Sequence, residues 1–157
     1  MSEEQRAEVL NFLHAFNTHG VKFLVVGGYA VNHYGYSRTT ADIHIYLQDS
    51  VDNRKRIIDA LDKLGYGRFE ELLKVPILAG YCEIMLDDGM YVDLMTAIPG
   101  LDPGHFDEQY KRRSETEVEG VLISYISFPD LMINKEKTGR TKDLDDYDQL
   151  LKVHSGL

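Results

Sequence analysis

The segment that most restricts the fold of this chain is a short apolar run that ends in two glycines. Residues 22–26, Lys-Phe-Leu-Val-Val, have the β-branched and aromatic content of a buried strand. Gly27 and Gly28 end that strand, and the residues from Tyr29 to Tyr34 begin a helix. Glycines permit positive φ and a close approach of a phosphate, while the free amides at a helix start point toward it. Because a Gly-Gly between a strand and a helix is usually only a tight turn, this segment alone does not establish a phosphate site.

The rest of the chain supplies helices and strands in the order of a mixed α/β domain. A first helix is expected at residues 2–20, where Ser2 and Gln5 form a capping box and Gly20 ends the helix. The later expected elements are a strand at 42–47, a helix at 52–64, a hairpin of 81–86 and 90–96 turning at 87–89, a second hairpin at 115–127 turning near 119–120, a helix from Pro129 to about Thr138 ended by Gly139, and a last helix capped by Thr141. This order predicts one α/β (α+β) domain over residues 1–157, with a small mixed sheet packed by helices and with helices at the C-terminus.

Composition and charge restrict the classes of function. The 157 residues are 43% hydrophobic, which is enough for a core without disulfides, and the single cysteine, Cys82, fits a reducing compartment. The N-terminus has no signal-peptide pattern and the longest apolar stretch is too short to span a bilayer, so we expect a cytoplasmic protein without a membrane partner. The net charge of −9 argues against general affinity for polyanions. A local basic cluster nevertheless suits a small phosphate-bearing ligand or one end of an RNA: Lys135, Lys137, Arg140 and Lys142.

Two predicted strands carry polar side chains that apolar packing does not explain. Asp42 and His44 share one face of the strand at 42–47, because alternate side chains of a strand point the same way, while Ile43 packs into the core. Asp93 interrupts the apolar run at 91–95. Burying such a carboxylate without a partner is costly, so Asp93 requires a cation, a metal ion or an exposed strand edge.

Taken together, these features resemble the nucleotidyltransferase fold of the polymerase-beta-like superfamily. Residues 23–47 are similar to the opening motif of that superfamily, in which Gly-Gly or Gly-Ser is followed, after a helix, by Asp-x-Asp. The similarity is greatest to small bacterial members, including abortive-infection-type toxin nucleotidyltransferases. Residues 131–150, with a lysine, an arginine and then Lys-Asp on a helix, resemble a later motif of the same family.

The resemblance implies roles for residues from both ends of the chain. Asp42 and Asp93 would be catalytic, with Asp93 as candidate base, and together with His44 they would bind a divalent metal ion, Mg²⁺ or Mn²⁺. The nucleotide would be held by Gly27, Gly28, Lys135 and Arg140, with Asp143 organising the helix face. Attack on an α-phosphate builds negative charge on the attacking and leaving oxygens, which divalent cations held by carboxylates stabilise. The implied activity is binding of a nucleoside triphosphate and transfer of a nucleoside monophosphate to a hydroxyl of RNA, protein or a small molecule, with an antitoxin-like partner in toxin-type members.

His44 departs from the family pattern, which has a second aspartate at this position. An imidazole removes one negative charge and suits Mn²⁺, Zn²⁺ or iron better than Mg²⁺. Three interpretations follow: His44 is a ligand of a softer metal ion, or an imidazolium that replaces the metal between two acids, or a solvent-facing side chain at a strand end. The chain is accordingly an enzyme, or a degenerate nucleotide- or partner-binding module, or a structural domain whose acids are ordinary surface groups.

Overall fold

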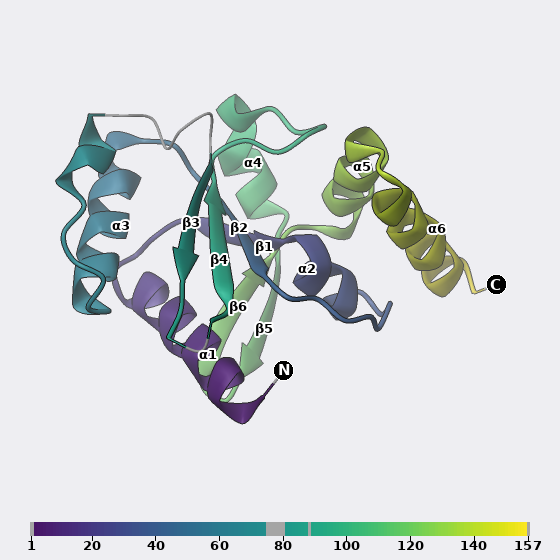
Figure 1. Cartoon of the computed structure of the whole chain (residues 1–157). Coiled ribbons are helices and arrows are strands. Elements are labelled where there is room, and N and C mark those ends of the chain that lie inside the picture. The colour runs from purple at the N-terminus through teal and green to yellow at the C-terminus, as the bar shows by residue number, and fades with distance from the viewer. Residues whose placement is uncertain (1, 75–80, 88, 157) are drawn as a thin grey trace.

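A six-stranded mixed sheet forms the centre of the computed structural model, which describes residues 2–74, 81–87 and 89–156 (Figure 1). Along the sheet the order is β3–β4–β2–β1–β6–β5. β1 pairs antiparallel with β2 and parallel with β6, while β4 pairs parallel with β2. The strands span Phe23–Val26 (β1), Ile43–Leu47 (β2), Tyr81–Met85 (β3), Tyr91–Met95 (β4), Ser114–Val118 (β5) and Val121–Tyr125 (β6). The expected α/β domain with a small mixed sheet is confirmed.

Helices precede, separate and follow the strands. Their bounds are Glu3–Thr18 (α1), Gly27–His33 (α2), Val51–Lys63 (α3), Phe106–Lys111 (α4), Phe128–Thr138 (α5) and Thr141–Ser155 (α6), with short 3-10 turns at Glu70–Leu73 and Pro103–His105. The capping box of α1 is present, since the Ser2 hydroxyl accepts from the Gln5 amide and the Gln5 side chain accepts from the Ser2 amide. None of the described helices is both long and apolar enough to span a membrane.

Alternating side chains divide the core between the two faces of the sheet. Phe23 and Val25 of β1 point toward the cluster that includes α1 and α3, whereas Leu24 and Val26 point toward the cluster of α2, α5 and α6. On β2, Ile43 packs with the α1 side, so that His44 and the fully buried Tyr46 face the α2 and α5 side. Figure 1 shows α5 and α6 on the same side of the sheet as α2. The strand pleat therefore directs His44 toward the C-terminal helices.

Several predicted boundaries differ from the structure. α2 begins at Gly27 rather than Tyr29, so both glycines belong to its first turn, and Gly27 has a φ of +67°. Apolar periodicity could not show this, because glycine contributes no side chain to the pattern. Asp42 lies one residue before β2, and Arg140 rather than Thr141 is the N-cap of α6. Of the predicted turn at 87–89, Asp88 lies outside the described residues.

Candidate metal and nucleotide site

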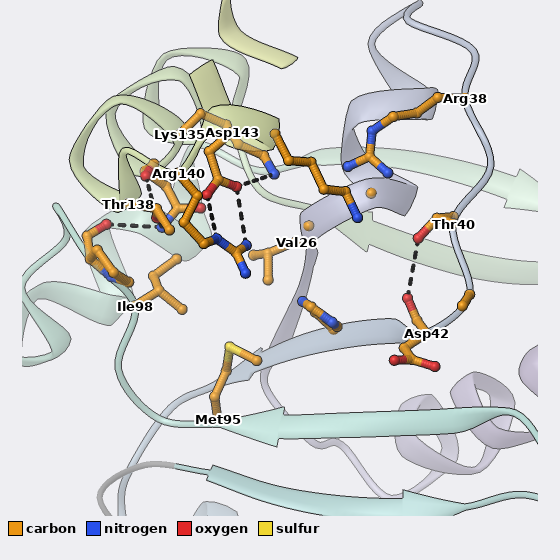
Figure 2. Close-up of a pocket in the computed structure, with 17 residues that line it drawn as sticks. Val26, Arg38, Thr40, Asp42, Met95, Ile98, Lys135, Thr138, Arg140 and Asp143 are labelled. Atoms are coloured by element: carbon orange, nitrogen blue, oxygen red, sulfur yellow. Dashed lines mark hydrogen bonds and ion pairs between the residues drawn. The ribbon is translucent and has the colours of Figure 1, made fainter. Parts of the chain in front are cut away.

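A cavity of about 240 Å³ lies between the strand end of β1, the residues before β2, and the two C-terminal helices. Eight of the residues that the sequence singled out line it, and Asp93 does not: Gly27, Gly28, Asp42, His44, Lys135, Arg140, Lys142 and Asp143. Figure 2 shows the Lys135 and Arg140 side chains on one side of the cavity and Asp42 on the other. Residues more than ninety positions apart in the sequence are thus brought to one place by the fold.

The two aspartates and the histidine of the strand side form a tight cluster. Asp42, His44 and Asp93 each offer one ligand atom, and these three atoms lie within 4.8 Å of one another. His44 and Asp93 are register partners on the parallel strands β2 and β4, and Nε2 of His44 lies 3.0 Å from Oδ2 of Asp93. The Asp93 side chain is only 7% exposed, while that of His44 is 37% exposed. The lone acid of β4 is therefore buried against a polar neighbour and not placed at a solvent-facing edge.

Burial decides the protonation of His44. It lowers the pKa of His44 below its ordinary value, and the positive charges on α5 and α6 lower it further, while Asp42 opposes them. A lowered pKa favours the neutral imidazole over the fixed imidazolium, while the contact with Asp93 favours the charged form. The solvent-facing interpretation disagrees with the contact between His44 and Asp93. A neutral imidazole is the form of histidine that binds metal ions.

The donor set fits a divalent metal ion. Two carboxylates and a neutral imidazole offer oxygen and nitrogen atoms that converge within ligand spacing. Such a mixed set suits Mn²⁺ or Zn²⁺ better than Mg²⁺, which prefers an all-oxygen environment. The residues that would hold the ion are Asp42, His44 and Asp93.

The two glycines make room for side chains of the site. A Cβ on Gly27 would lie 2.9 Å from Nδ1 of His44, closer than real Cβ contacts occur. A Cβ on Gly28 would lie 2.7 Å from Cβ of Thr40, whose hydroxyl bonds to the backbone oxygen of Asp42 (Figure 2). The glycines are therefore required by the close packing of α2 on His44 and Thr40. Contact of either glycine with a phosphate remains a prediction.

On the helix side, Lys135 is held between two buried aspartates. Its Nζ lies 3.2 Å from Oδ1 of Asp143 and 2.9 Å from Oδ2 of Asp146. Arg140 Nε donates to Asp143 at 2.7 Å (Figure 2). The Lys135 side chain is 6% exposed and that of Arg140 is 70% exposed. Lys135 is therefore fixed in place, whereas Arg140 remains accessible at the rim.

Two residues of this network were missed or undervalued by the sequence analysis. Asp146 was not singled out, although it follows Asp143 by three positions and so shares its helix face. The second residue is Arg38, which lies shortly before β2 and donates two hydrogen bonds to Asp146. Burial alone would raise the pKa of Asp146, but the bonds from Arg38 and Lys135 outweigh burial and hold that pKa below its ordinary value. Asp146 is consequently ionised at neutral pH.

Comparison with known proteins identifies a shared architecture. No protein-family model and no curated protein sequence matches the chain. Among solved structures, a Thermotoga maritima protein provisionally named a nucleotidyltransferase matches with a TM-score of 0.62 at 18% identity, covering 97% of this chain and 96% of its own. The lincomycin-bound lincosamide antibiotic adenylyltransferase LnuA matches with a TM-score of 0.57 at 17% identity, covering 98% of both chains. The antibiotic-resistance factor ANT(2'')-Ia matches with a TM-score of 0.54 at 13% identity, covering 97% of this chain and 85% of its own.

Proposed function

We propose that this chain, which has the nucleotidyltransferase fold, binds a nucleoside triphosphate with a divalent metal ion and transfers the nucleoside monophosphate to an acceptor hydroxyl. The fold follows from the structural matches, which extend over nearly the whole chain. The activity is inferred from the site.

One observation carries the proposal. Asp42 and His44 line the same cavity as the cations Lys135 and Arg140, and the buried Asp93 lies directly behind them in the same acidic cluster. A metal-bound triphosphate needs both: carboxylates to hold the metal ion, and cations to hold the phosphate oxygens that the metal ion leaves uncovered. Ordinary core packing does not explain why charges of opposite sign from the residues before β2 and from the α5–α6 region line one cavity.

When bound, the metal ion would stabilise the negative charge that develops on the phosphoryl oxygens. Lys135, fixed by its two aspartates, would present its ammonium group to the phosphates without losing further side-chain freedom. Arg140 is exposed at the rim and its guanidinium could meet a second phosphate oxygen. The glycines of α2 keep the wall beside His44 free of side chains.

In this proposal Asp93 accepts the proton of the acceptor hydroxyl. The acceptor oxygen forms a bond to the α-phosphorus, the bond from that phosphorus to the oxygen of the β-phosphate breaks, and pyrophosphate leaves. The hydroxyl proton passes to Asp93, which is buried and lies 3.0 Å from Nε2 of His44. Asp42 lies at the open side of the cluster, where it is half-buried.

The cavity is smaller than the roughly 300–1,000 Å³ typical of sites that enclose a drug-sized ligand. At about 240 Å³ it suits the triphosphate, with the nucleoside extending outward. Met95, Ile98 and Pro99 form the apolar part of the wall where a nucleoside could rest.

A binding experiment tests the first half of the proposal. Thermal unfolding is measured with each of ATP, CTP, GTP and UTP in the presence of Mn²⁺ or Mg²⁺. A ligand at a hundredfold excess over its Kd adds about 2.7 kcal/mol to the free energy of unfolding, so a binder raises the Tm clearly. If no nucleotide–metal pair raises the Tm, the proposed function is wrong.

A transfer experiment tests the second half. Triphosphates labelled at the α-phosphate are incubated with the protein and, in parallel, with total RNA, with a protein lysate or with small hydroxyl compounds. LnuA is named for transfer to a small antibiotic, which motivates the third arm. The first two arms test the RNA and protein acceptors expected from the family resemblance. A labelled protein band would also direct the search for an antitoxin-like partner.

One observation favours a second candidate, a non-catalytic binding module. Nε2 of His44 already contacts Asp93, so the imidazole and the carboxylate satisfy each other without a metal ion. A nucleotide that raises the Tm equally with and without Mn²⁺, together with no labelled product in any arm, would support this candidate over the enzyme.

A further inference from the structure

We infer that Asp146 is a positioning residue for both sides of the site. It holds Lys135 at the cavity wall and, through Arg38, fixes the segment at 38–42 that ends in Asp42. The consequence for metal and nucleotide binding rests on the proposed function, whereas the coupling itself rests on the geometry that follows.

The contact between Asp146 and Arg38 is bidentate and buried. Arg38 Nε donates to Oδ1 of Asp146 at 2.7 Å, and Nη2 donates to Oδ2 at 2.8 Å. The Asp146 side chain is 1% exposed and that of Arg38 is 14% exposed. Two parallel charge-assisted bonds in a buried setting fix both the distance and the orientation of the guanidinium. They join α6 to the chain between α2 and β2.

Arg38 in turn orders the segment that carries Asp42. Residues 36–42 are in neither a helix nor a strand, so side-chain contacts must define their path. The Arg38 amide donates to Asn32 on α2 at 3.1 Å, and Nη1 donates to the backbone oxygen of Thr39 at 3.1 Å. Thr40 packs where a Cβ of Gly28 would lie and bonds to the backbone oxygen of Asp42. If Arg38 loses its anchor on α6, this segment keeps only weaker contacts and Asp42 is less well placed.

Asp143 provides a matched comparison on the same helix. Like Asp146, it is buried and bonds to Lys135. Its other cation is Arg140, three residues earlier in the chain, so its contacts remain within the α5–α6 pair. Removing either aspartate deletes one negative charge from the same network and one acceptor from Lys135. Only the loss of Asp146 releases Arg38.

The experiment compares Asp146→Asn, Asp143→Asn and, as a charge control, Asp148→Asn at an exposed position of α6. Hydrogen exchange of the amides at 36–42 is measured on the metal-free protein, and the affinity for Mn²⁺ alone is measured at a temperature where every variant is folded. We expect faster exchange at 36–42 and about tenfold weaker Mn²⁺ binding in Asp146→Asn, as the loss of hydrogen bonds between charged groups predicts. Asp148→Asn should match the wild type in both measurements, and Asp143→Asn should match it in the exchange at 36–42, because it keeps the bonds from Arg38 to Asp146.

If Asp146→Asn does not fold, Arg38→Lys tests the same coupling. This variant retains the positive charge and the pair between Asp146 and Lys135, but it loses the bidentate contact of the guanidinium with Asp146. It should reproduce the faster exchange at 36–42.

Equal exchange and equal Mn²⁺ affinity in all variants, with only a lower Tm in Asp146→Asn, would show a purely structural role and overturn the inference. If the wild type binds neither Mn²⁺ nor any metal–nucleotide pair, the proposed function fails, while the exchange at 36–42 still decides whether Asp146 orders that segment.

Discussion

The two walls of the cavity differ in how their charged side chains are paired. On the helix side three cations, Arg38, Lys135 and Arg140, surround two aspartates, and every aspartate is bonded to two of them. On the sheet side two aspartates share one neutral imidazole. The formal charge is +1 for this bonded network and −2 for the two aspartates with a neutral His44, and Lys142 adds a further positive charge to the cavity lining.

This difference separates a network whose charges are paired from a cluster that carries an excess of negative charge. The helix side is internally satisfied and has one positive charge in excess, which suits phosphate oxygens. The sheet side lacks positive charge, and carboxylates so close together favour a bound cation. A metal–triphosphate complex would complement both walls at once.

The largest expected effect is on the sheet side. Asp93→Asn removes the candidate base together with one metal ligand, and general-base contributions are about 10²–10⁴-fold in rate. We expect nucleotidyl transfer to fall by at least about a hundredfold. Rates are measured with the α-labelled triphosphate and the acceptor that the wild type uses. Glu117→Gln, which removes an exposed strand acid from the far edge of the sheet, is the control and should retain full activity. Full activity of Asp93→Asn would remove Asp93 from the mechanism.

The helix side should instead respond through stability. Lys135→Met leaves two buried carboxylates without their shared cation, and breaking such a buried pair costs about 3–5 kcal/mol. Arg140→Met removes an exposed partner of Asp143 and should cost less than about 1 kcal/mol. The free energy of unfolding is measured by urea denaturation of the ligand-free protein. Equal losses in the two variants would mean that the buried network is not organised around Lys135.

The metal preference tests the departure at His44. His44→Asp restores an all-oxygen donor set, so the affinity for Mg²⁺ should rise by about tenfold relative to that for Mn²⁺. Titration calorimetry with each ion, on the variant and the wild type, gives the ratio. An unchanged ratio would mean that His44 is not a metal ligand, and the interpretation of His44 as a ligand of a softer metal ion would be wrong.

The smallest effect concerns pH. Because burial lowers the pKa of His44 in the folded state, the unfolded chain takes up a proton first, at its ordinary pKa of about 6.5. Stability should therefore fall as the pH decreases below about 6.5 and level off below the folded pKa. Burial also lowers the pKa of His33, so it contributes to the same slope. We expect His44→Asn and His33→Asn each to reduce the slope of unfolding free energy against pH between 5 and 7. An unchanged slope in His44→Asn would contradict a lowered pKa of His44.

Many helix ends and turns could be predicted from the sequence because they depend on residues that are close together in the chain. The capping box of Ser2, the left-handed Gly139 that ends α5 and the turn at Glu119 and Gly120 each depend on neighbours in the sequence. The register of β2 with β4, which pairs His44 with Asp93, was expected only as a convergence of side chains. The start of α2 at Gly27 was predicted wrongly, because two glycines carry no periodic side-chain signal.

The sequence by itself determined the kinds of chemistry available, since it placed Asp42, His44 and Asp93 on strands and the cations Lys135 and Arg140 on a late helix pair. Tertiary structure decided which of these groups are satisfied. It buried Asp146 between Arg38 and Lys135, contacts that span 108 and 11 positions of the chain, and it set the protonation of His44 through burial. Charge, burial and long-range contact are properties of packing in three dimensions, and no local pattern in a single sequence records them.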